Sequence, residues 1–518
     1  MKKMSEEQKY EKRRQEALKR KKELHKMQNA KIKPATKQKL TTAGVSLLVL
    51  VLLVVWVFFN VGFPRRMVTA LSVGNEKVST AEFSYYYTQQ AMSTYNSYYE
   101  YFGGAYVPFD TGKSLDKQMY SEEQSWADYL EEAAITAVKD VKCLVKAAEE
   151  AGYTLSEEGK TTVDNQMATY LLYANASGVS LDRYLAESYG LGVNEKLMRE
   201  IHTEYQLAME YDEYVYNSFE YSEDEIQAYY ENEVKKDYTY VDVRLMAFTT
   251  AEADEDTEAV TLEQAKEEAD AFAAEATTEA KFAEKALEVL KERARAAAEE
   301  GKEEEAAEAV TDNSEFLETS LTNIETVDAN LLVWVTDEAR AEGDVAVVEM
   351  DDEAGYYVVY MIKTAYRQEY NTKDVRQIYV AAEDTTDEAM AEAKKTAEEL
   401  LEQWKSGAAN EATFIELANK ESDLESDGGL AEEVIKSDDA IGEWLFDESR
   451  QEGDTAVLEG DGSYHVIYYK GNNAPLWQIQ VDSAMRSADY NEAFTEIEEK
   501  LTVTQNGLGL WMKAKPFR

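Results

Sequence analysis

The sequence predicts an α+β protein with an apolar N-terminal span, a helical region and two copies of one mixed module. Three observations lead to this fold class. Apolar residues recur at helical spacing from Trp126 to Ala148, which indicates one buried face of a long helix. Runs such as V-R-Q-I-Y-V and S-Y-H-V-I-Y-Y-K are typical of strands. The segment W-V-T-D-E-A-R-A-E-G-D returns 110 residues later as W-L-F-D-E-S-R-Q-E-G-D, which indicates a repeat.

The composition limits the classes of function. The 518 residues are 44% hydrophobic, which is enough to form the cores of several domains. Asp and Glu number 103 against 54 Lys and Arg, for a net charge of −49. An acidic body argues against nucleic-acid binding, which requires basic patches. With three histidines and the single cysteine Cys143, we expect no metal site, no cofactor and no disulfide within this sequence.

The N-terminal stretch predicts a membrane anchor. Residues 1–40 carry 15 Lys and Arg against 5 Asp and Glu and are interpreted as a basic cytosolic tail. Residues 41–63 are expected to form a transmembrane helix, because 25 uncharged residues separate Lys39 from Arg65 and a span needs about 20. The basic flank would stay inside, giving a single-pass cell-membrane protein with an extracytoplasmic body and the lipid bilayer as a partner. The alternative is a cleaved signal peptide, whose apolar region is shorter.

The region 71–238 is predicted to be mostly helical. Two β-prone runs flank Gly74-Asn75, which is typical of a hairpin turn. Ser222 and Glu225 have the spacing of a capping box, which marks the start of a helix. The helices expected in between cover residues 157–175, 181–188 and 194–218.

The repeat extends over two modules, at 240–365 and 373–471. Arg244 in V-R-L-M-A-F matches Arg376 in V-R-Q-I-Y-V with an offset of 132 residues, and Phe282 matches Phe414 with the same offset. The Trp-led segment repeats after only 110 residues, so the first copy holds 22 extra residues. After the second copy, residues 475–518 contain a further amphipathic segment.

The second module resembles the parvulin family of peptidyl-prolyl isomerases. It carries F-I-E-L-A from Phe414, an S-D loop that ends in Gly428-Gly429, a G-D turn and Y-H-V-I from Tyr464. The helical region, with V-G-N-E-K-V-S at its start and S-E-D-E-I-Q-A-Y-Y at its end, looks like the chaperone region of PrsA- and SurA-type extracytoplasmic foldases. The resemblance implies that a small antiparallel sheet packs with helices in each module. It also implies a chaperone domain at 71–238 and a C-terminal helix, within 475–518, that returns to it.

The resemblance implies a function and a site. Such a protein would bind unfolded, proline-containing exported polypeptides and catalyse cis–trans isomerisation of X-Pro bonds. Rotation about that bond faces a barrier of about 18–20 kcal/mol, which a site lowers by binding the twisted amide more tightly than either planar form. The implied catalytic residues are His465, Asp423 and Gln377. The residues implied for the apolar proline slot are Trp444, Leu445, Phe446 and Ile467.

Departures from the family pattern leave other functions open. Gln377 stands where active parvulins carry a histidine. The first module has Leu245 and Tyr357 where the second has Gln377 and His465, so we expect it to be inactive. One alternative is therefore a non-catalytic holdase chaperone. Another is a cell-surface scaffold that binds an envelope partner through its acidic faces. The sequence predicts no oligomeric state.

Overall fold

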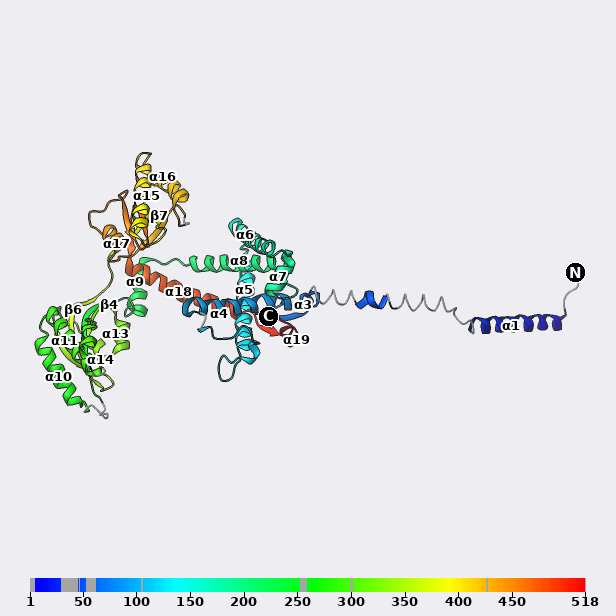
Figure 1. Ribbon diagram of the computed structural model, residues 1–518, viewed down its shortest axis with the longest axis horizontal. Coiled ribbons are helices and arrows are strands. Elements are labelled where there is room, and N and C mark those ends of the chain that lie inside the picture. Colours follow the sequence, from blue (N-terminus) through cyan, green and yellow to red (C-terminus); the bar gives the residue numbers. More distant parts are fainter. Residues whose placement is uncertain are drawn as a thin grey trace. The chain divides into compact units, whose positions relative to one another are not determined.

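The computed structural model describes residues 5–28, 45, 47–52, 62–103, 106–251, 259–298, 301–424 and 427–517. Contacts divide the chain into two units (Figure 1). Unit 1 combines Met1–Ser218 with Asn491–Arg518, and unit 2 is Phe219–Tyr490.

Unit 1 contains a three-stranded antiparallel sheet built from both ends of the chain. Its strand order is β11-β1-β2, where β1 is Thr69–Val73, β2 is Glu76–Ser79 and β11 is Val503–Gln505. The turn between β1 and β2 uses Gly74 at φ +57°, a conformation that glycine adopts without steric cost. A strand from the C-terminal segment therefore completes a sheet that begins at residue 69.

The other elements in the described part of unit 1 are helices. They are α1 (Glu6–Gln28), α3 (Phe63–Met67), α4 (Thr80–Phe102), η2 (Leu115–Lys117), α5 (Trp126–Ala151), α6 (Glu157–Ala176), α7 (Leu181–Tyr189), α8 (Glu195–Asn217), the end of α18 (Leu476–Glu499) and α19 (Gly507–Trp511). Helices α4 to α8 each begin at a Ser or Asn whose side chain accepts a hydrogen bond from the first turn. Phe83, Leu130 and Met198 are fully buried in their shared core. The buried Lys142 Nζ lies 2.9 Å from Glu82 and 2.5 Å from Glu204, and so joins α4, α5 and α8.

The first sheet of unit 2 has the order β4-β3-β6-β5. These strands are β3 (Tyr240–Thr249), β4 (Glu315–Ser320), β5 (Val345–Glu349) and β6 (Gly355–Tyr366). Residues of α10 (Leu262–Glu275) and α11 (Glu279–Ala297) form a core on one face. Residues of α13 (Leu321–Val327) and α14 (Ala329–Val335) form a core on the other. The short α12 (Glu303–Glu308) follows α11.

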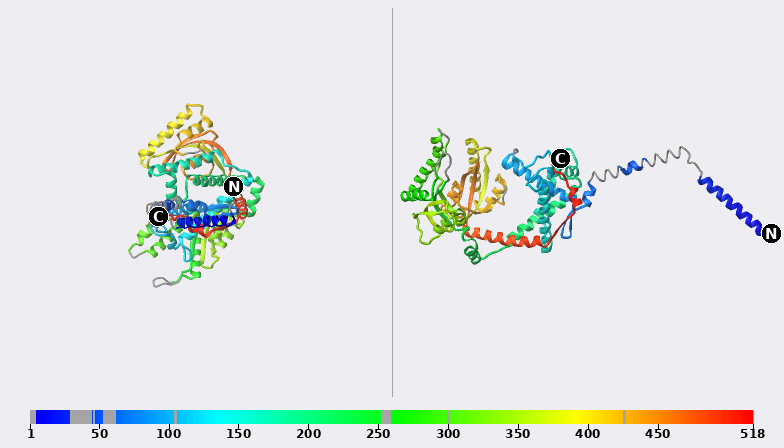
Figure 2. Two further views of the ribbon diagram at one scale, coloured as in Figure 1. Left: turned by 90° about the vertical axis from the view of Figure 1, so that its right-hand side faces the viewer. Right: turned by 90° about the horizontal axis from the view of Figure 1, so that it is seen from below.

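The second sheet has the corresponding order β8-β7-β10-β9. These strands are β7 (Asn371–Ala381), β8 (Leu430–Val434), β9 (Thr455–Gly460) and β10 (Ser463–Pro475). Helices α15 (Asp387–Lys405) and α16 (Glu411–Glu421) cover one face, visible as yellow helices beside orange strands in Figure 2. Helix α17 (Ala440–Leu445) packs on the other face.

The two sheets carry the same buried contacts at matched positions. Arg244 in β3 pairs with Glu279 at 3.5 Å, and Arg376 in β7 pairs with Glu411 at 3.1 Å. Phe282 and Phe414, one helical turn further on, are both fully buried. The guanidinium carbons of Arg340 and Arg450 lie 5.5 Å and 3.8 Å from the ring centroids of Trp334 and Trp444, respectively. The residues that repeat in sequence therefore occupy equivalent places in two sheets of one topology.

A helical connection completes unit 2. Helix α9 (Glu223–Tyr229) and the π-helical turn η3 (Tyr230–Val234) belong to this unit, although the sequence groups them with the helical region 71–238. The reason is a small core in which Tyr230 packs with Trp477 and Val481 from the start of α18 (Leu476–Glu499). Arg367 strengthens this contact, since its guanidinium carbon lies 3.6 Å from the Trp477 ring centroid.

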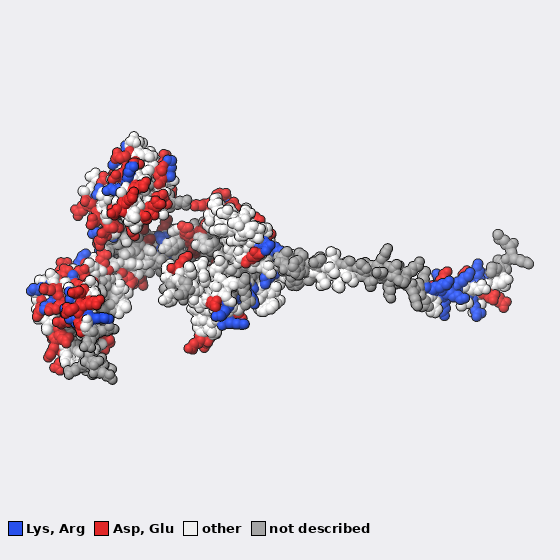
Figure 3. Space-filling view, in the orientation of Figure 1, with Lys and Arg blue, Asp and Glu red and all other residues white. Residues whose placement is uncertain are grey.

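The prediction of a transmembrane helix at 41–63 is corrected here. In the part of the chain that the structure describes, no helix combines the length and the apolar character that crossing a membrane requires. Of residues 41–63, only Val45, Leu47–Leu52, Gly62 and Phe63 belong to that part. The predicted single-pass localisation depended on this helix and is contradicted with it, whereas the lipid bilayer as a partner is not tested. Asp and Glu side chains are spread over the visible surface of unit 2 (Figure 3).

Candidate functional site

The candidate site lies on the α17 face of the second sheet. Strands β7 and β10 are antiparallel, with His465 opposite Tyr379 and Ile467 opposite Gln377. Side chains directly opposite each other in an antiparallel pair share one face, so these four residues point to the same side. Leu458 of β9 lies opposite His465 and joins them.

Hydrogen bonds at both ring nitrogens fix the orientation of the His465 ring. Nδ1 lies 3.0 Å from Oε1 of Gln377, and Nε2 lies 3.2 Å from Oγ of Ser463. Because a carboxamide oxygen only accepts, Nδ1 carries the proton and Nε2 of the neutral ring accepts from the Ser463 hydroxyl. The ring also meets Tyr379 edge to face, with centroids 5.1 Å apart. Gly460 leaves room for it, since a Cβ there would lie 2.6 Å from Nε2.

Burial keeps the imidazole neutral. It lowers the pKa of His465 below the ordinary value of 6.5, because the charged form loses its hydration. The carboxylate of Asp439 opposes this shift in pKa without overcoming it. At neutral pH the site therefore offers an uncharged ring in a fixed tautomer.

The hydrogen-bond partners of Asp423 are backbone groups of β7. Its Oδ2 accepts a hydrogen bond from the Ala381 N–H at 3.0 Å, and its own N–H donates to the Tyr379 carbonyl at 2.9 Å. The hydroxyl of Ser422 accepts from the Tyr379 N–H at 3.1 Å. Asp423 thus ties its loop to the edge of β7. A catalytic role for Asp423 stays a prediction. The contacts given above are structural, because they hold the loop against β7.

Three of the residues predicted for the proline slot come from the end of α17, and the fourth, Ile467, lies on the sheet beneath it. Leu445 and Ile467 are 0% and 1% exposed and form a core with Val375 and Tyr469. Trp444 packs against this core and carries the Arg450 guanidinium on its ring face. Phe446 meets Tyr370 edge to face, with centroids 5.5 Å apart. Substrate binding by these residues stays a prediction. Leu445 and Ile467 are enclosed by their neighbours.

The Gly428-Gly429 loop positions Gln377. Both glycines have positive φ, +60° and +72°. A Cβ on Gly429 would lie 2.0 Å from the Gln377 carbonyl oxygen, so only glycine allows this approach. The approach lets the Gln377 N–H donate to the Gly429 carbonyl at 2.8 Å. Arg376 supports the loop by donating to the Asp427 carbonyl at 2.7 Å.

The first module lacks this polar pair. Tyr357 lies opposite Ala247, and Val359 lies opposite Leu245, at the register positions of His465, Tyr379, Ile467 and Gln377. Leu245 packs into the apolar core of its sheet. A hydrogen-bonded His–Gln pair is therefore a property of the second module.

Sequence reasoning missed Ser463, Tyr379, Gly460 and Asp439. The alternation of β10 was a usable signal for Ser463, since it stands two residues before His465 and so shares its face. No comparable signal marks Asp439, because only the folded chain brings its carboxylate near the His465 ring. Among the residues that the structure describes, no group of three or more His, Cys, Asp and Glu side chains could hold a metal ion.

Comparisons with known proteins give little beyond this geometry. No family model matches the sequence, and no curated protein matches it. Among solved structures, the chain is similar to a 1.70 Å crystal structure of the peptidylprolyl isomerase PrsA from Bacillus anthracis, with 14% sequence identity over 46% of this chain and 87% of that one. The TM-score is 0.18, which is too low to support a conclusion about fold or mechanism.

Proposed function

We propose that the chain is a protein foldase. In this proposal unit 1 binds unfolded polypeptide segments, the second module accelerates rotation about X-Pro bonds, and the first module is not catalytic. The observation that carries the proposal is the hydrogen bond between His465 and Gln377. It joins the two residues that the parvulin resemblance assigns to the site and has no counterpart at Tyr357 and Leu245.

The chemistry requires no covalent step. A site speeds isomerisation when it stabilises the twisted amide more than the planar one. An uncharged, immobile imidazole in a partly desolvated place supports this, because fixed dipoles need no reorganisation as the amide loses conjugation. Gln377 and Ser463 act as positioning residues, since each holds one ring nitrogen of His465.

A second candidate is a holdase that binds polypeptides without catalysis. Two observations favour it. Leu445 and Ile467, assigned to the proline slot, are enclosed in the core beneath α17. The Asp423 carboxylate is held by the backbone of β7. Under this candidate the His465–Gln377 pair stabilises the sheet.

Two assays on the whole chain separate the candidates. The first measures the isomerisation rate of a proline-containing tetrapeptide, and the second measures suppression of aggregation of a chemically unfolded protein. For the foldase we expect isomerisation above background, lost in His465→Ala and retained in Tyr357→Ala, the matched change in the first module. Suppression of aggregation without isomerisation would select the holdase. Absence of both activities would reject both candidates.

A further inference from the structure

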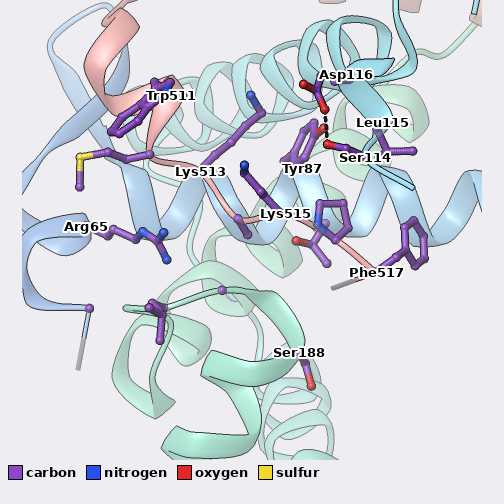
Figure 4. A pocket seen from close by; sticks show the side chains of 18 of the residues that line it. Arg65, Tyr87, Ser114, Leu115, Asp116, Ser188, Trp511, Lys513, Lys515 and Phe517 are labelled. Carbon is purple, nitrogen blue, oxygen red and sulfur yellow. Dashed lines mark hydrogen bonds between the residues drawn. The ribbon is translucent and has the colours of Figure 1, made fainter. Parts of the chain in front are cut away.

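Unit 1 contains a half-open cavity of about 880 Å³. Its walls come from α3, α4, η2, the end of α7 and the segment from Trp511 to Phe517 (Figure 4). Pockets that bind small molecules or short peptide segments range over roughly 300–1,000 Å³. The cavity is therefore large enough for several side chains of a ligand.

Arg65 places in the cavity lining a cation that has no carboxylate partner among the described residues. Its side chain is half-buried, and burial lowers its pKa because the charged form loses hydration. Among the described residues, its guanidinium has neither an ion-pair partner nor a hydrogen-bond acceptor. By contrast, Lys513 on the same wall pairs with Glu131 at 2.6 Å. A desolvated cation without a counter-ion is costly, and a bound carboxylate would satisfy it.

The backbone holds Arg65 firmly against the cavity. A Cβ on Gly62 would lie 2.1 Å from the Gly192 nitrogen, and one on Gly192 would lie 3.0 Å from Cβ of Ala81. Both glycines have positive φ, +69° and +102°. This glycine contact clamps α3 onto the loop after α7, so Arg65 belongs to a fixed wall.

Thr88 is a second unsatisfied group in the same cavity. It lines the space, is 2% exposed, and its hydroxyl has no hydrogen-bond partner within the described chain. Ser84, one turn earlier on α4, shows the usual behaviour, because its hydroxyl donates to the Thr80 carbonyl and accepts from the Ala514 N–H. A buried hydroxyl without a partner costs free energy, but this oxygen is closed to solvent, so Thr88 contributes shape to the wall and not a hydrogen bond to a ligand.

The remaining charges and apolar groups complete the description of the ligand. Asp116 accepts a hydrogen bond from Ser114, and Glu187 pairs with Arg183, so the cavity's own carboxylates have partners. The exposed Lys515 adds a further cation to the lining. Apolar surface comes from Leu115, Leu191, Met512, Pro516 and Phe517.

We propose that this cavity binds a peptide carboxylate together with a neighbouring apolar side chain. Arg65 is the counter-ion, and the apolar wall receives the side chain. The inference rests on the proposed function in one respect, namely that unit 1 is the polypeptide-binding part. It adds the chemical class of the segment, which carries either a free chain terminus or an Asp or Glu side chain.

The test is a fluorescence-anisotropy titration of the whole chain with three peptides that carry an uncharged dye. All contain Leu and Phe; one ends in a free carboxylate, one in an amide, and one in an amide but with an internal Asp. We expect at least one anionic peptide to bind about tenfold more tightly than the neutral one, and the better of the two identifies the source of the carboxylate. This preference should shrink as salt is raised, because screening weakens the charge attraction.

Variants assign the preference to the cavity. Arg65→Gln should remove the tenfold preference, and Arg65→Lys should keep part of it. Arg66→Gln should leave it unchanged, because Arg66 lies over the Phe63 ring, outside the cavity lining. Thr88→Val should raise Tm and leave the preference unchanged, since it replaces an unpaired buried hydroxyl that is closed to solvent with a methyl group.

The outcomes separate this inference from the proposed function. If all three peptides bind equally, or if Arg65→Gln keeps the preference in a variant of normal Tm, the carboxylate site is wrong and polypeptide binding stands. If no peptide binds but aggregation is suppressed, the cavity is again excluded while the chaperone function survives. If no peptide binds and aggregation proceeds, both proposals are overturned.

Discussion

Gln377 and His465 are diagonal neighbours across β7 and β10. The residue directly opposite His465 is Tyr379, and Gln377 lies two positions along, opposite Ile467. A glutamine side chain has the reach to bridge such a diagonal, and its Oε1 lies 3.0 Å from Nδ1 of the histidine. The pair therefore restrains the ring in a way that a shorter residue at position 377 would not allow.

Gln377→Leu tests the value of this hydrogen bond. Leucine is the residue at the matched position 245, so the strand accepts its shape. The change leaves Nδ1 of His465 without its partner, and we expect the free energy of unfolding to fall by about 1–2 kcal/mol. Urea unfolding followed by circular dichroism measures this. Gln403→Leu, on the exposed side of α15, is the control and should change stability little. An unaltered unfolding midpoint for Gln377→Leu would mean that the pair contributes nothing.

The neutral state of His465 predicts a pH dependence of stability. Burial lowers its folded pKa below 6.5, so below that pH the unfolded chain binds more protons than the folded one. The contribution is thus fully present above pH 6.5 and is lost as pH falls through that value toward the folded pKa. Unfolding free energies of wild type and His465→Gln between pH 5 and 8 isolate the effect. Their difference should shrink as the pH falls, and a constant difference would contradict the prediction.

The pair of Asp140 and Glu498 leads us to expect the opposite pH dependence of stability in unit 1. Burial, followed by the hydrogen bond to Glu498, raises the pKa of Asp140 to about 6. Glu498 keeps the charge, because Lys139 Nζ lies 3.0 Å from its Oε1 and lowers its pKa. Folding is therefore penalised as the pH rises through about 6. Asp140→Asn should stabilise the protein at pH 7.5 by about 1 kcal/mol, after discounting for solvent screening, and not at pH 4. Glu499→Gln, at an exposed neighbour, should show no such difference.

We expect replacement of Arg244 to cause a large loss of stability. Its guanidinium lies 2.7 Å from Asp312, 2.7 Å from Glu315 and 3.5 Å from Glu279, and the side chain is 9% exposed. Arg244→Met leaves three carboxylates facing one another without their cation, so we expect a loss of about 3 kcal/mol. Lys236→Met breaks the exposed pair with Glu325 and should cost less than about 1 kcal/mol. Thermal unfolding of the two variants compares them, and equal shifts in Tm would be the contrary result.

Local signals in the sequence were most informative about helices. The segment predicted at 194–218 contains α8, Glu195–Asn217, because Asn194 is a strong N-cap and apolar residues recur at helical spacing. The face of α5 was less accurate. The helical spacing from Trp126 and Leu130 leads to Ala133 and Ala137, which are half-buried, whereas Ala134 and Val138 are fully buried. Trp126, Leu130 and Val141 are buried as the spacing predicts, so the buried stripe is wider than expected and not turned. It also includes Lys142, which pairs with two carboxylates, and sequence periodicity carries no information on that pairing.

The candidate site was less accessible to sequence reasoning. Alternation along β10 placed His465 on the face of Ile467, which is its place in the structure. The direction of Asp423 depends on backbone pairing between its loop and β7. Whether Leu445 lines a slot or fills a core depends on how closely α17 packs. Neither arrangement is encoded in a local pattern, and the same holds for the cavity that Arg65 and the segment after Trp511 both line.

The sheet order β11-β1-β2 has a consequence for biosynthesis. A ribosome releases residues 69–79 long before residues 503–505, yet Val73 and Val503 are register partners in one sheet. The strands of the two sheets in unit 2 come from one continuous stretch of the chain. These sheets can therefore fold while translation continues. Unit 1 must wait for the end of synthesis, and until then its first hairpin carries an unprotected edge strand. Premature termination anywhere before residue 503 would therefore damage the beginning of the molecule.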